Sequence, residues 1–281
     1  MAWIPPFKRR SFRLRAFSAH QKTFAWRLLH THRTRVKSTT RRALYRPAAG
    51  LLLITGACLV ALAFYGLATV PDVSRLRQTN PSTTALIQAR AVEAQEQGRS
   101  FAPQRSWVPL SRISPYIQKA VIVAEDASFY SHWGFDWEGI KEAAVRNVEQ
   151  GRLERGGSTI TQQLAKNLYL SSDKTLLRKI NEAMITFALE YRLSKSRILE
   201  IYLNVVEWGQ DVYGVESAAQ HHFGKSATDL TSEEAALLAA ILPAPRQNDP
   251  LLMTPYLSKR QEWILYWMEK QNGVPVSADV R

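Results

Sequence analysis

The stretch RGGSTITQQLAKNLYL, residues 155–170, contains the clearest helix start in the chain. Thr159 and Gln162 have the T-x-x-Q spacing of a capping box, in which each side chain bonds to the backbone of the other residue. Behind this cap, apolar side chains repeat at helical spacing in Ile160, Leu164 and Leu168. The stretch therefore predicts an amphipathic helix over Ser158–Leu170.

The same apolar periodicity of three and four residues recurs along most of the chain after Asp72. It predicts further helices at Tyr116–Ala127, Trp137–Gln150, Thr175–Tyr191, Lys195–Val205, Gly214–His222, Ser232–Leu242 and Pro255–Lys270. Thr231 or Ser232 precedes Glu234 as a start signal for one of them, and Pro243 follows as a stop signal. No convincing alternating strand pair is visible. The sequence thus predicts a mostly α fold, with a single domain over residues 72–281.

Positive charge is concentrated near the beginning of the chain. Thirteen of the 37 Lys and Arg residues lie between Lys8 and Arg46, and no acidic residue precedes Asp72. Subtracting 13 from 37 leaves 24 basic residues against 24 acidic ones, so the tail accounts for the whole net charge of +13. A nucleic-acid-binding domain usually spreads basic residues over a folded face, so this distribution argues against nucleic acid as a partner.

An uncharged stretch of 23 residues, AAGLLLITGACLVALAFYGLATV, lies between Pro47 and Pro71. A helix rising about 1.5 Å per residue would cover a hydrocarbon core of about 30 Å with this length, and a cleaved signal peptide is shorter. Because positive charge stays on the cytoplasmic side, the basic flank predicts the orientation. We expect a basic cytoplasmic tail over 1–46, a transmembrane signal anchor over 47–71 and, in a bacterium, a periplasmic domain at the inner membrane.

Two adjacent carboxylates, Glu125 and Asp126, lie in the stretch AEDASFYSHWGFD, residues 124–136. On a helix or helix end, Glu125 shares a face with Phe129 and His132, while Asp126 is turned by about 100°. The two acids should therefore have different functions. Glu125 follows the apolar run AVIVA, which predicts a partly desolvated carboxylate whose pKa rises toward that of a general base. Capping or a salt bridge at a helix end would explain both acids equally well.

Two further groups of polar residues lie on predicted helices. Thr159, Gln163 and Lys166 align at i, i+4 and i+7, and such a stripe of hydroxyl, amide and ammonium groups suits sugar hydroxyls and phosphate oxygens. A solvated helix face is the alternative. Arg178 and Glu182 lie one turn apart beside Lys179, a pattern that an i,i+4 salt bridge alone would explain.

In order and spacing, these stretches closely resemble the glycosyltransferase family 51, specifically the monofunctional biosynthetic peptidoglycan glycosyltransferases. The block E-D-x-x-F-x-x-H-x-G is present as Glu125, Asp126, Phe129, His132 and Gly134. The others are G-G-S-T-I-T-Q-Q-x-x-K-N at Gly156–Asn167, R-K-x-x-E at Arg178, Lys179 and Glu182, K-x-x-I-L-E-x-Y-L-N at Lys195–Asn204, and E-A-A-L-L-A at Glu234–Ala239. The resemblance covers roughly Trp107–Pro245. Fewer than forty residues follow it, without a transpeptidase block.

This resemblance implies a two-lobed, lysozyme-like domain that polymerises lipid II into β-1,4-linked glycan strands of peptidoglycan and releases undecaprenyl pyrophosphate. It implies an inverting displacement in which Glu125 is the general base and Glu182 a second catalytic residue. It assigns substrate binding to Asp126, Phe129, His132, Ser158, Thr159, Gln162, Gln163, Lys166, Asn167, Arg178 and Lys179. The implied partners are lipid II, the growing strand and membrane lipid, with cell-division or elongation proteins as further candidates.

No cofactor is required by this reading. Some members of the family respond to Mg²⁺ or Mn²⁺, which a carboxylate near the pyrophosphate could hold, but no dedicated ligand cage is readable in the sequence. Two other functions remain open. A lytic or hydrolytic glycosidase would use a similarly placed Glu as an acid, although it would not need Lys166, Arg178 and Lys179. A single-pass division scaffold would use the acids only structurally.

Overall fold

The computed structural model describes residues 50–51, 53–58, 60–61, 64–66, 68–150, 157–171 and 175–270. The chain divides into two compact units, Met1–Tyr65 and Gly66–Arg281. The described residues of the first unit are helical, and the predicted basic tail over 1–46 lies outside the described residues. The predicted anchor over 47–71 is described only in part. None of the helical stretches that the structure describes has the length and apolarity needed to cross a bilayer.

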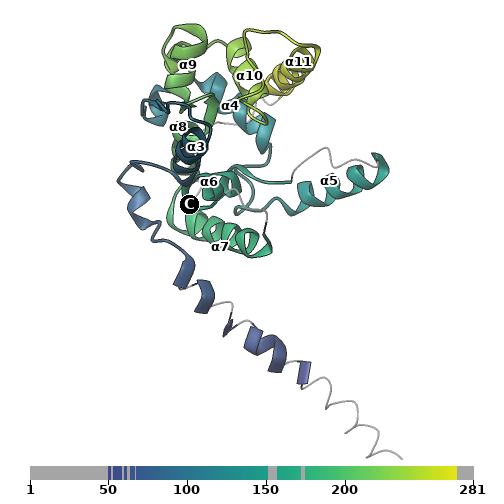
Figure 1. Ribbon diagram of the computed structural model, residues 1–281. Coiled ribbons are helices and arrows are strands. Elements are labelled where there is room, and N and C mark those ends of the chain that lie inside the picture. Colours follow the sequence, from purple (N-terminus) through teal and green to yellow (C-terminus); the bar gives the residue numbers. More distant parts are fainter. Residues whose placement is uncertain are drawn as a thin grey trace, which may run out of the picture. The chain divides into compact units, whose positions relative to one another are not determined.

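The second unit is mostly α-helical, as predicted (Figure 1). Its helices are α3 (Ala85–Glu96), α4 (Pro115–Glu125), α5 (Trp137–Gln150), α6 (Ile160–Tyr169), α7 (Leu176–Arg192), α8 (Lys195–Val205), α9 (Val215–Phe223), α10 (Ser232–Ile241) and α11 (Pro255–Lys270). Short 3-10 helices lie at η1 (Ser74–Arg77), η2 (Leu110–Arg112) and η3 (Ala227–Asp229). Every predicted helix is present, and its bounds agree with the structure to within two residues at each end.

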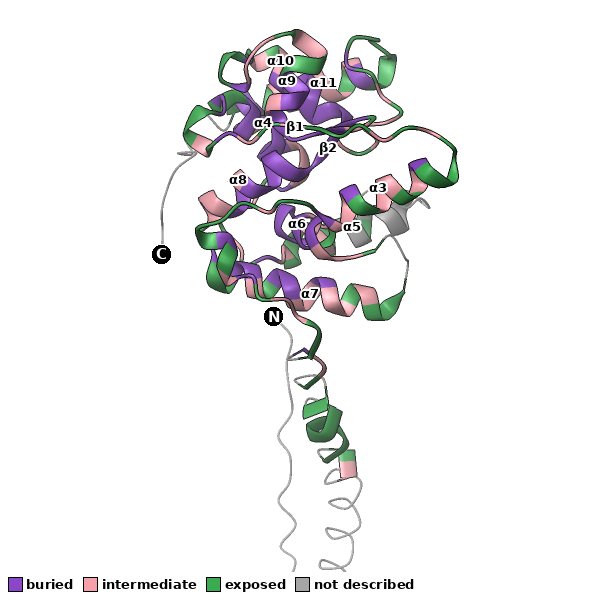
Figure 2. Ribbon diagram, turned by 60° about the vertical axis from the view of Figure 1, so that its left-hand side comes forward, coloured by how far each residue is buried: buried purple, intermediate pink, exposed green. Residues whose placement is uncertain are grey.

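The helices of the second unit pack in two groups. Helix α10 packs against α4 and α11, whereas α6 packs against α7, α8 and α3. Figure 1 shows α4, α10 and α11 in the upper part of this unit and α6 and α7 in the lower part, with α5 projecting to one side. Buried residues run through α4, α6 and α8, which link the two groups in one continuous core (Figure 2).

Besides the short 3-10 helices, a sheet and one helix of the second unit are missing from the sequence-based prediction. One is a small sheet of β1 (Gln104–Arg105), β3 (Val212–Tyr213) and β2 (Glu207–Gly209), in that order, with β1 parallel and β2 antiparallel to β3. Strands of two or three residues are too short to show an alternating pattern. The other is α3, which buries only Ile87 and Ala94 and therefore has no continuous apolar stripe to detect.

The capping box at the start of α6 is confirmed. The backbone N–H of Gln162 donates to Thr159 Oγ1 at 3.2 Å, and the backbone N–H of Thr159 donates to Gln162 Oε1 at 3.0 Å. The Thr159 hydroxyl also donates to the carbonyl of Gly134 at 2.7 Å. Gly134 has φ +78°, and a Cβ there would lie 2.7 Å from the Thr186 side chain, so this position requires glycine. The loop after α4 is thereby fixed against both α6 and α7.

Candidate active site

The carboxylate of Glu125 lies at the C-terminal end of α4, with its side chain 13% exposed. Its Oε2 accepts a hydrogen bond from Gln163 Nε2 at 2.9 Å. Its Oε1 lies 3.3 Å from Arg260 Nη2. Burial raises the pKa of Glu125 above its usual value, although the Gln163 hydrogen bond and the charges of Arg260 and Lys166 oppose this shift. The desolvation that the apolar run before Glu125 predicts is therefore present.

The side-chain amide of Gln163 is held from its other end by Tyr202. The Tyr202 hydroxyl, which comes from α8, donates to Gln163 Oε1 at 2.9 Å. This bond leaves the amide nitrogen facing Glu125. Burial, together with the charge of Glu125, raises the pKa of Tyr202 well above its usual value, so the phenol remains a donor. Tyr202 belongs to the block Lys195–Asn204, in which the sequence analysis singled out no site residue, so its role here was missed.

A second residue missed by the sequence analysis is Arg260, which lies on α11. It is 135 residues from Glu125 along the chain, yet its guanidinium contacts the carboxylate directly. Its Nε is buried and has no hydrogen-bond partner among the described residues. Nothing in the periodicity of α11 separates Arg260 from an ordinary surface cation, because the contact depends on how α11 packs against α4.

Asp126 has different partners from Glu125, as predicted. Its Oδ2 accepts from the backbone N–H of Ile160 at 2.9 Å, which is the first residue of α6. Its Oδ1 lies 2.8 Å from His132 Nε2. The side chain is almost fully buried, and it joins the end of α4 to the start of α6. Asp126 therefore positions the helix that carries Gln163 and Lys166.

The shared helical face predicted for Glu125, Phe129 and His132 is wrong, because α4 ends at Glu125 and the following residues form turns. The Phe129 side chain has no exposed surface, and Lys195 Nζ lies 4.5 Å from its ring centroid. In this structure Phe129 supports the loop from inside the core and does not line an open surface. His132 faces Asp126 instead of sharing a face with Glu125.

The predicted polar stripe on α6 is only partly available to a ligand. Thr159 and Gln162 are buried and use their side chains in the cap. Gln163 is half-buried at Glu125, whereas Lys166 is exposed and has no hydrogen-bond or ion-pair partner among the described residues. Ser158 is half-buried and Asn167 is buried near the two ends of this segment. Within the predicted stripe, Lys166 is thus the residue whose side chain is most available to bind an anion.

Arg178, Lys179 and Glu182 form a separate cluster at the start of α7. Arg178 Nη1 lies 2.6 Å from Glu182 Oε2, and Lys179 Nζ contacts Glu182 Oε1. The Glu182 side chain is buried, while Lys179 is exposed. The predicted one-turn pair is confirmed, and Glu182 holds both cations together. Since α6 packs against α7, this cluster belongs to the same helix group as Lys166.

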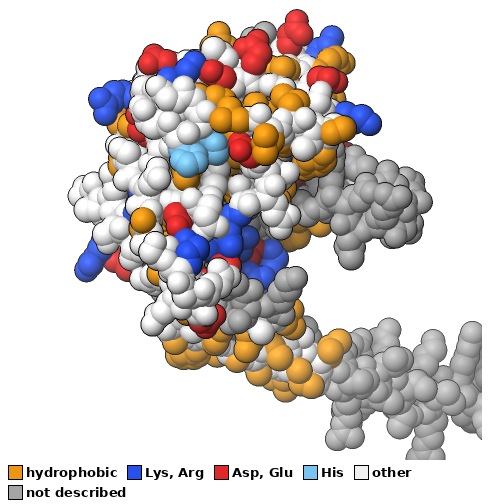
Figure 3. Space-filling model, turned by 45° about the horizontal axis from the view of Figure 1, so that its top comes forward, with side chains coloured by type: hydrophobic (Ala, Val, Ile, Leu, Met, Phe, Trp, Pro, Cys, Tyr) orange, Lys and Arg blue, Asp and Glu red, His pale blue; other side chains and the backbone are white. Residues whose placement is uncertain are grey.

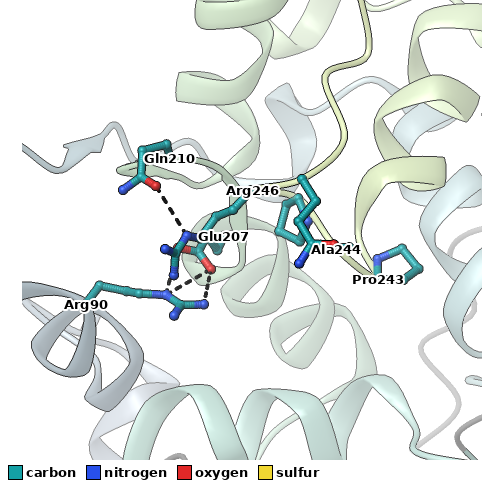
Figure 4. A pocket seen from close by; sticks show the side chains of 8 residues that line it. Arg90, Glu207, Gln210, Pro243, Ala244 and Arg246 are labelled. Carbon is teal, nitrogen blue, oxygen red and sulfur yellow. Dashed lines mark hydrogen bonds and ion pairs between the residues drawn. The ribbon is translucent and has the colours of Figure 1, made fainter. Parts of the chain in front are cut away.

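A cavity of about 460 Å³ lies between α3, β2 and the segment after α10, lined by Arg90, Glu207, Gln210 and residues 243–247 (Figure 4). Arg90 pairs with Glu93 at 2.7 Å and with Glu207 at 2.8 Å, and Arg246 pairs with Glu93 at 2.9 Å. Both guanidinium groups are thereby neutralised by carboxylates. On the face drawn in Figure 3, Lys and Arg side chains likewise gather beside Asp and Glu side chains.

The part of the chain that the structure describes contains no group of three or more His, Cys, Asp or Glu residues arranged to hold a metal ion. The acids at the site already have protein partners: Glu125 faces Gln163 and Arg260, and Glu182 faces Arg178 and Lys179. The carboxylates of the candidate site are therefore paired with protein groups in this structure.

The sequence of this chain is similar to that of a known protein family. A sequence profile described as "Transglycosylase" matches residues 92–269, which is more than half of the chain. The chain belongs to the transglycosylase family. The family predicted from the motif blocks, the peptidoglycan glycosyltransferases, is therefore confirmed, and the chain is a transferase. The match extends on both sides of the stretch that the motifs covered, so in this transglycosylase Arg260 and all of α11 except Lys270 lie inside the family region.

Several relatives are similar to this transglycosylase over most of their length. A biosynthetic peptidoglycan transglycosylase of Nitrosospira multiformis is 51% identical over 66% of this chain and 81% of its own. Proteins with the same description from Alcanivorax borkumensis and Chromobacterium violaceum are 47% and 42% identical, over 80% and 75% of this chain and 86% and 92% of their own.

Proposed function

We propose that this transglycosylase polymerises lipid II into β-1,4-linked glycan strands of peptidoglycan, releasing undecaprenyl pyrophosphate. The observation that carries the proposal is the environment of Glu125, a desolvated carboxylate with a raised pKa, aligned by Gln163 and Arg260. A carboxylate in this state is a better base than an ordinary surface Glu, because its pKa lies nearer the working pH. The relatives named as biosynthetic peptidoglycan transglycosylases supply the substrate class.

In the proposed step the 4-hydroxyl of the acceptor GlcNAc attacks the anomeric carbon of the donor MurNAc. The hydroxyl proton moves to Glu125, a new glycosidic bond forms, and the bond from the anomeric carbon to the pyrophosphate oxygen breaks with inversion. Negative charge grows on the departing pyrophosphate, so nearby cations stabilise the transition state more than the ground state. We assign this role to Lys166, Arg178 and Lys179.

Within this proposal Glu182 acts through its neighbours. It is buried and contacts both Arg178 and Lys179, so it can hold the two cations in the orientation that a pyrophosphate requires. The step uses no metal ion. Mg²⁺ or Mn²⁺ accompanying the pyrophosphate would add positive charge at the same place, and adding and chelating these ions during turnover tests that contribution.

We also propose that the segment over 47–71 anchors the enzyme in the bacterial inner membrane, with the basic tail in the cytoplasm and residues 72–281 in the periplasm. The described helical residues of this segment expose large apolar side chains at Leu51, Leu53, Ile54, Val60 and Phe64. Such side chains require an apolar environment. Reporter fusions at Met1 and Arg281 test the orientation: a fusion at Arg281 that is active only in the cytoplasm would contradict it.

The two helix groups of the second unit correspond, in this proposal, to the two lobes of a lysozyme-like glycosyltransferase domain. Glu125 ends α4 in one group, and Gln163 and Lys166 belong to α6 in the other. A substrate held at Glu125 would therefore contact both groups. Cell-division or elongation proteins remain candidate partners, and co-purification from membranes identifies them.

Incubation of the purified full chain with lipid II tests the proposed function directly. Polymeric glycan with release of undecaprenyl pyrophosphate supports it. Degradation of isolated sacculi without polymer formation would indicate a glycosidase, and inertness toward both substrates would indicate a scaffold. The Glu125→Gln variant, purified in parallel, separates turnover by this site from a contaminating activity.

A further inference from the structure

Large aromatic side chains are exposed on α11, next to the residue that contacts Glu125. Tyr256 is 51% exposed, Trp263 37% and Trp267 41%, although α11 also buries Leu257, Ile264 and Met268. At about 100° per residue, Tyr256, Trp263 and Trp267 lie within about 20° of one line along the helix. We call these three residues the α11 aromatic stripe. Exposed tryptophan in this amount indicates an interaction site.

Arg260 connects this stripe to the candidate active site. Its position falls about 40° from the same line, between Tyr256 and Trp263. Its Nη2 lies 3.3 Å from Glu125 Oε1, while its buried Nε has no hydrogen-bond partner among the described residues. Arg260 therefore links the helix that carries the stripe to the carboxylate of Glu125. A ligand lying on the aromatic rings would reach the general base.

We propose that the α11 aromatic stripe is a carbohydrate platform that holds the glycan strand beside Glu125. Sugar rings present apolar C–H faces and hydroxyl edges, so they match flat aromatic side chains flanked by a hydrogen-bond donor such as Arg260. The rings of Trp263 and Trp267 have centroids 6.3 Å apart and are inclined at 58° to each other, so each ring offers its own face to a sugar. From Tyr256 to Trp267 the helix extends for about 16 Å, enough for several sugars.

Membrane lipid is a less suitable occupant. Thr69, which follows the proposed anchor within the second unit, lies against α7, with its hydroxyl 3.4 Å from Asn181 Oδ1. Figures 1 and 2 both show α7 and α11 at opposite ends of this unit. The stripe thus lies far from the place where the second unit receives the chain from the anchor. A polymer that grows at Glu125 fits the position of the stripe, because Arg260 on the same helix contacts that carboxylate.

Calorimetric titration of the full chain with peptide-free glycan strands tests the platform, which rests on the proposed function but is read out without turnover. We expect Tyr256→Ala and Trp267→Ala each to weaken glycan binding about tenfold, with a larger loss in the double variant. Tyr116→Ala is the matched control, because Tyr116 is 50% exposed but lies at the opposite end of α4 from Glu125. Product strands made from lipid II by the double variant should also be shorter.

The two proposals can fail separately. If the wild-type chain binds glycan through the stripe but makes no polymer from lipid II, the polymerase proposal is wrong and the platform is retained. If the double variant binds glycan as tightly as the wild-type chain, the platform is overturned, whatever the polymerase activity. A loss of binding to phosphatidylethanolamine and phosphatidylglycerol vesicles, with glycan binding unchanged, would assign the stripe to the membrane and would also overturn the platform.

Discussion

Gln163 donates from Nε2 to Oε2 of Glu125 at 2.9 Å, which joins the first turns of α6 to the last residue of α4. The hydrogen bond favours the charged form of the carboxylate, whereas burial favours the neutral form, and burial dominates. Glu125 is therefore held in one orientation at a raised pKa.

Replacing Glu125 by Gln should abolish polymerisation without unfolding the protein. The amide keeps the shape of the side chain but cannot accept the proton, and a general base typically contributes a factor of about 10² to 10⁴. Initial rates on lipid II and thermal melting, measured on the same preparation, check this. A variant that folds and keeps near-wild-type turnover would remove Glu125 from the mechanism.

Tyr202→Phe should shift the pH dependence of the reaction. Without the hydroxyl, the Gln163 amide is free to turn, and the hydrogen bond that lowers the pKa of Glu125 weakens. The pKa of Glu125 then rises further, so the acidic limb of the rate profile moves to higher pH. Gln163→Leu should move it further in the same direction.

Tyr213→Phe is the matched control for this pH profile. The Tyr213 hydroxyl is also buried, but it has no hydrogen-bond partner among the described residues. Its removal should leave both limbs of the rate profile in place. A Tyr202→Phe profile that overlays that of Tyr213→Phe would show that Tyr202 does not act through Gln163.

Asp126→Ala should destabilise the protein and lower activity indirectly. It removes the acceptor of the Ile160 backbone N–H and of the contact with His132, and an unsatisfied buried group costs about 1–3 kcal/mol. Asp126→Asn keeps an acceptor oxygen and should be milder. Urea unfolding measures the loss of stability. Initial rates on lipid II, measured on the folded protein, should be higher for Asp126→Asn than for Asp126→Ala.

The effects of Arg178→Ala and Glu182→Gln on turnover should be non-additive. Glu182 holds Arg178 at 2.6 Å, so removing either residue disturbs the same cation. Lys166→Ala should lower turnover independently, since Lys166 has no ion-pair partner among the described residues. A double-mutant cycle on initial rates with lipid II measures the coupling.

Lys225→Ala provides the control for the charge cluster on α7. Lys225 forms an ordinary salt bridge with Glu234 at 2.8 Å, and such pairs contribute at most about 1 kcal/mol. This variant should melt slightly earlier and polymerise normally. If the Arg178, Glu182 and Lys166 variants behaved in the same way, these residues would not bind the pyrophosphate.

Stability should depend on pH through Glu93. Hydrogen bonds from Arg246 and Arg90 lower the pKa of Glu93 from 4.5 to about 2. A lowered pKa in the folded state contributes stability that is complete above the unfolded value and is lost as the pH falls toward about 2. The difference in urea midpoint between the wild-type chain and Glu93→Gln should therefore shrink below about pH 4.5. A constant difference would mean that Glu93 contributes no charge-dependent stability.

Local patterns in the sequence were sufficient to predict the helices and the different partners of the two acids. Helix bounds depend on apolar periodicity and caps within a few residues, which is why the Thr159 and Gln162 box was readable. Glu125 was identifiable because the apolar run before it belongs to the same buried helix. The uncharged segment over 47–71 is likewise a local signal, and its membrane role stays a prediction.

Only the tertiary structure decided which side chains meet Glu125. Gln163, Tyr202 and Arg260 come from three helices that are separated along the chain, and no local pattern encodes how α6, α8 and α11 pack around the end of α4. The end of α4 at Glu125 also placed Phe129 in the core and turned His132 toward Asp126. Short-range chemistry therefore determined the elements, while long-range packing determined the environment, and hence the pKa, of the carboxylate.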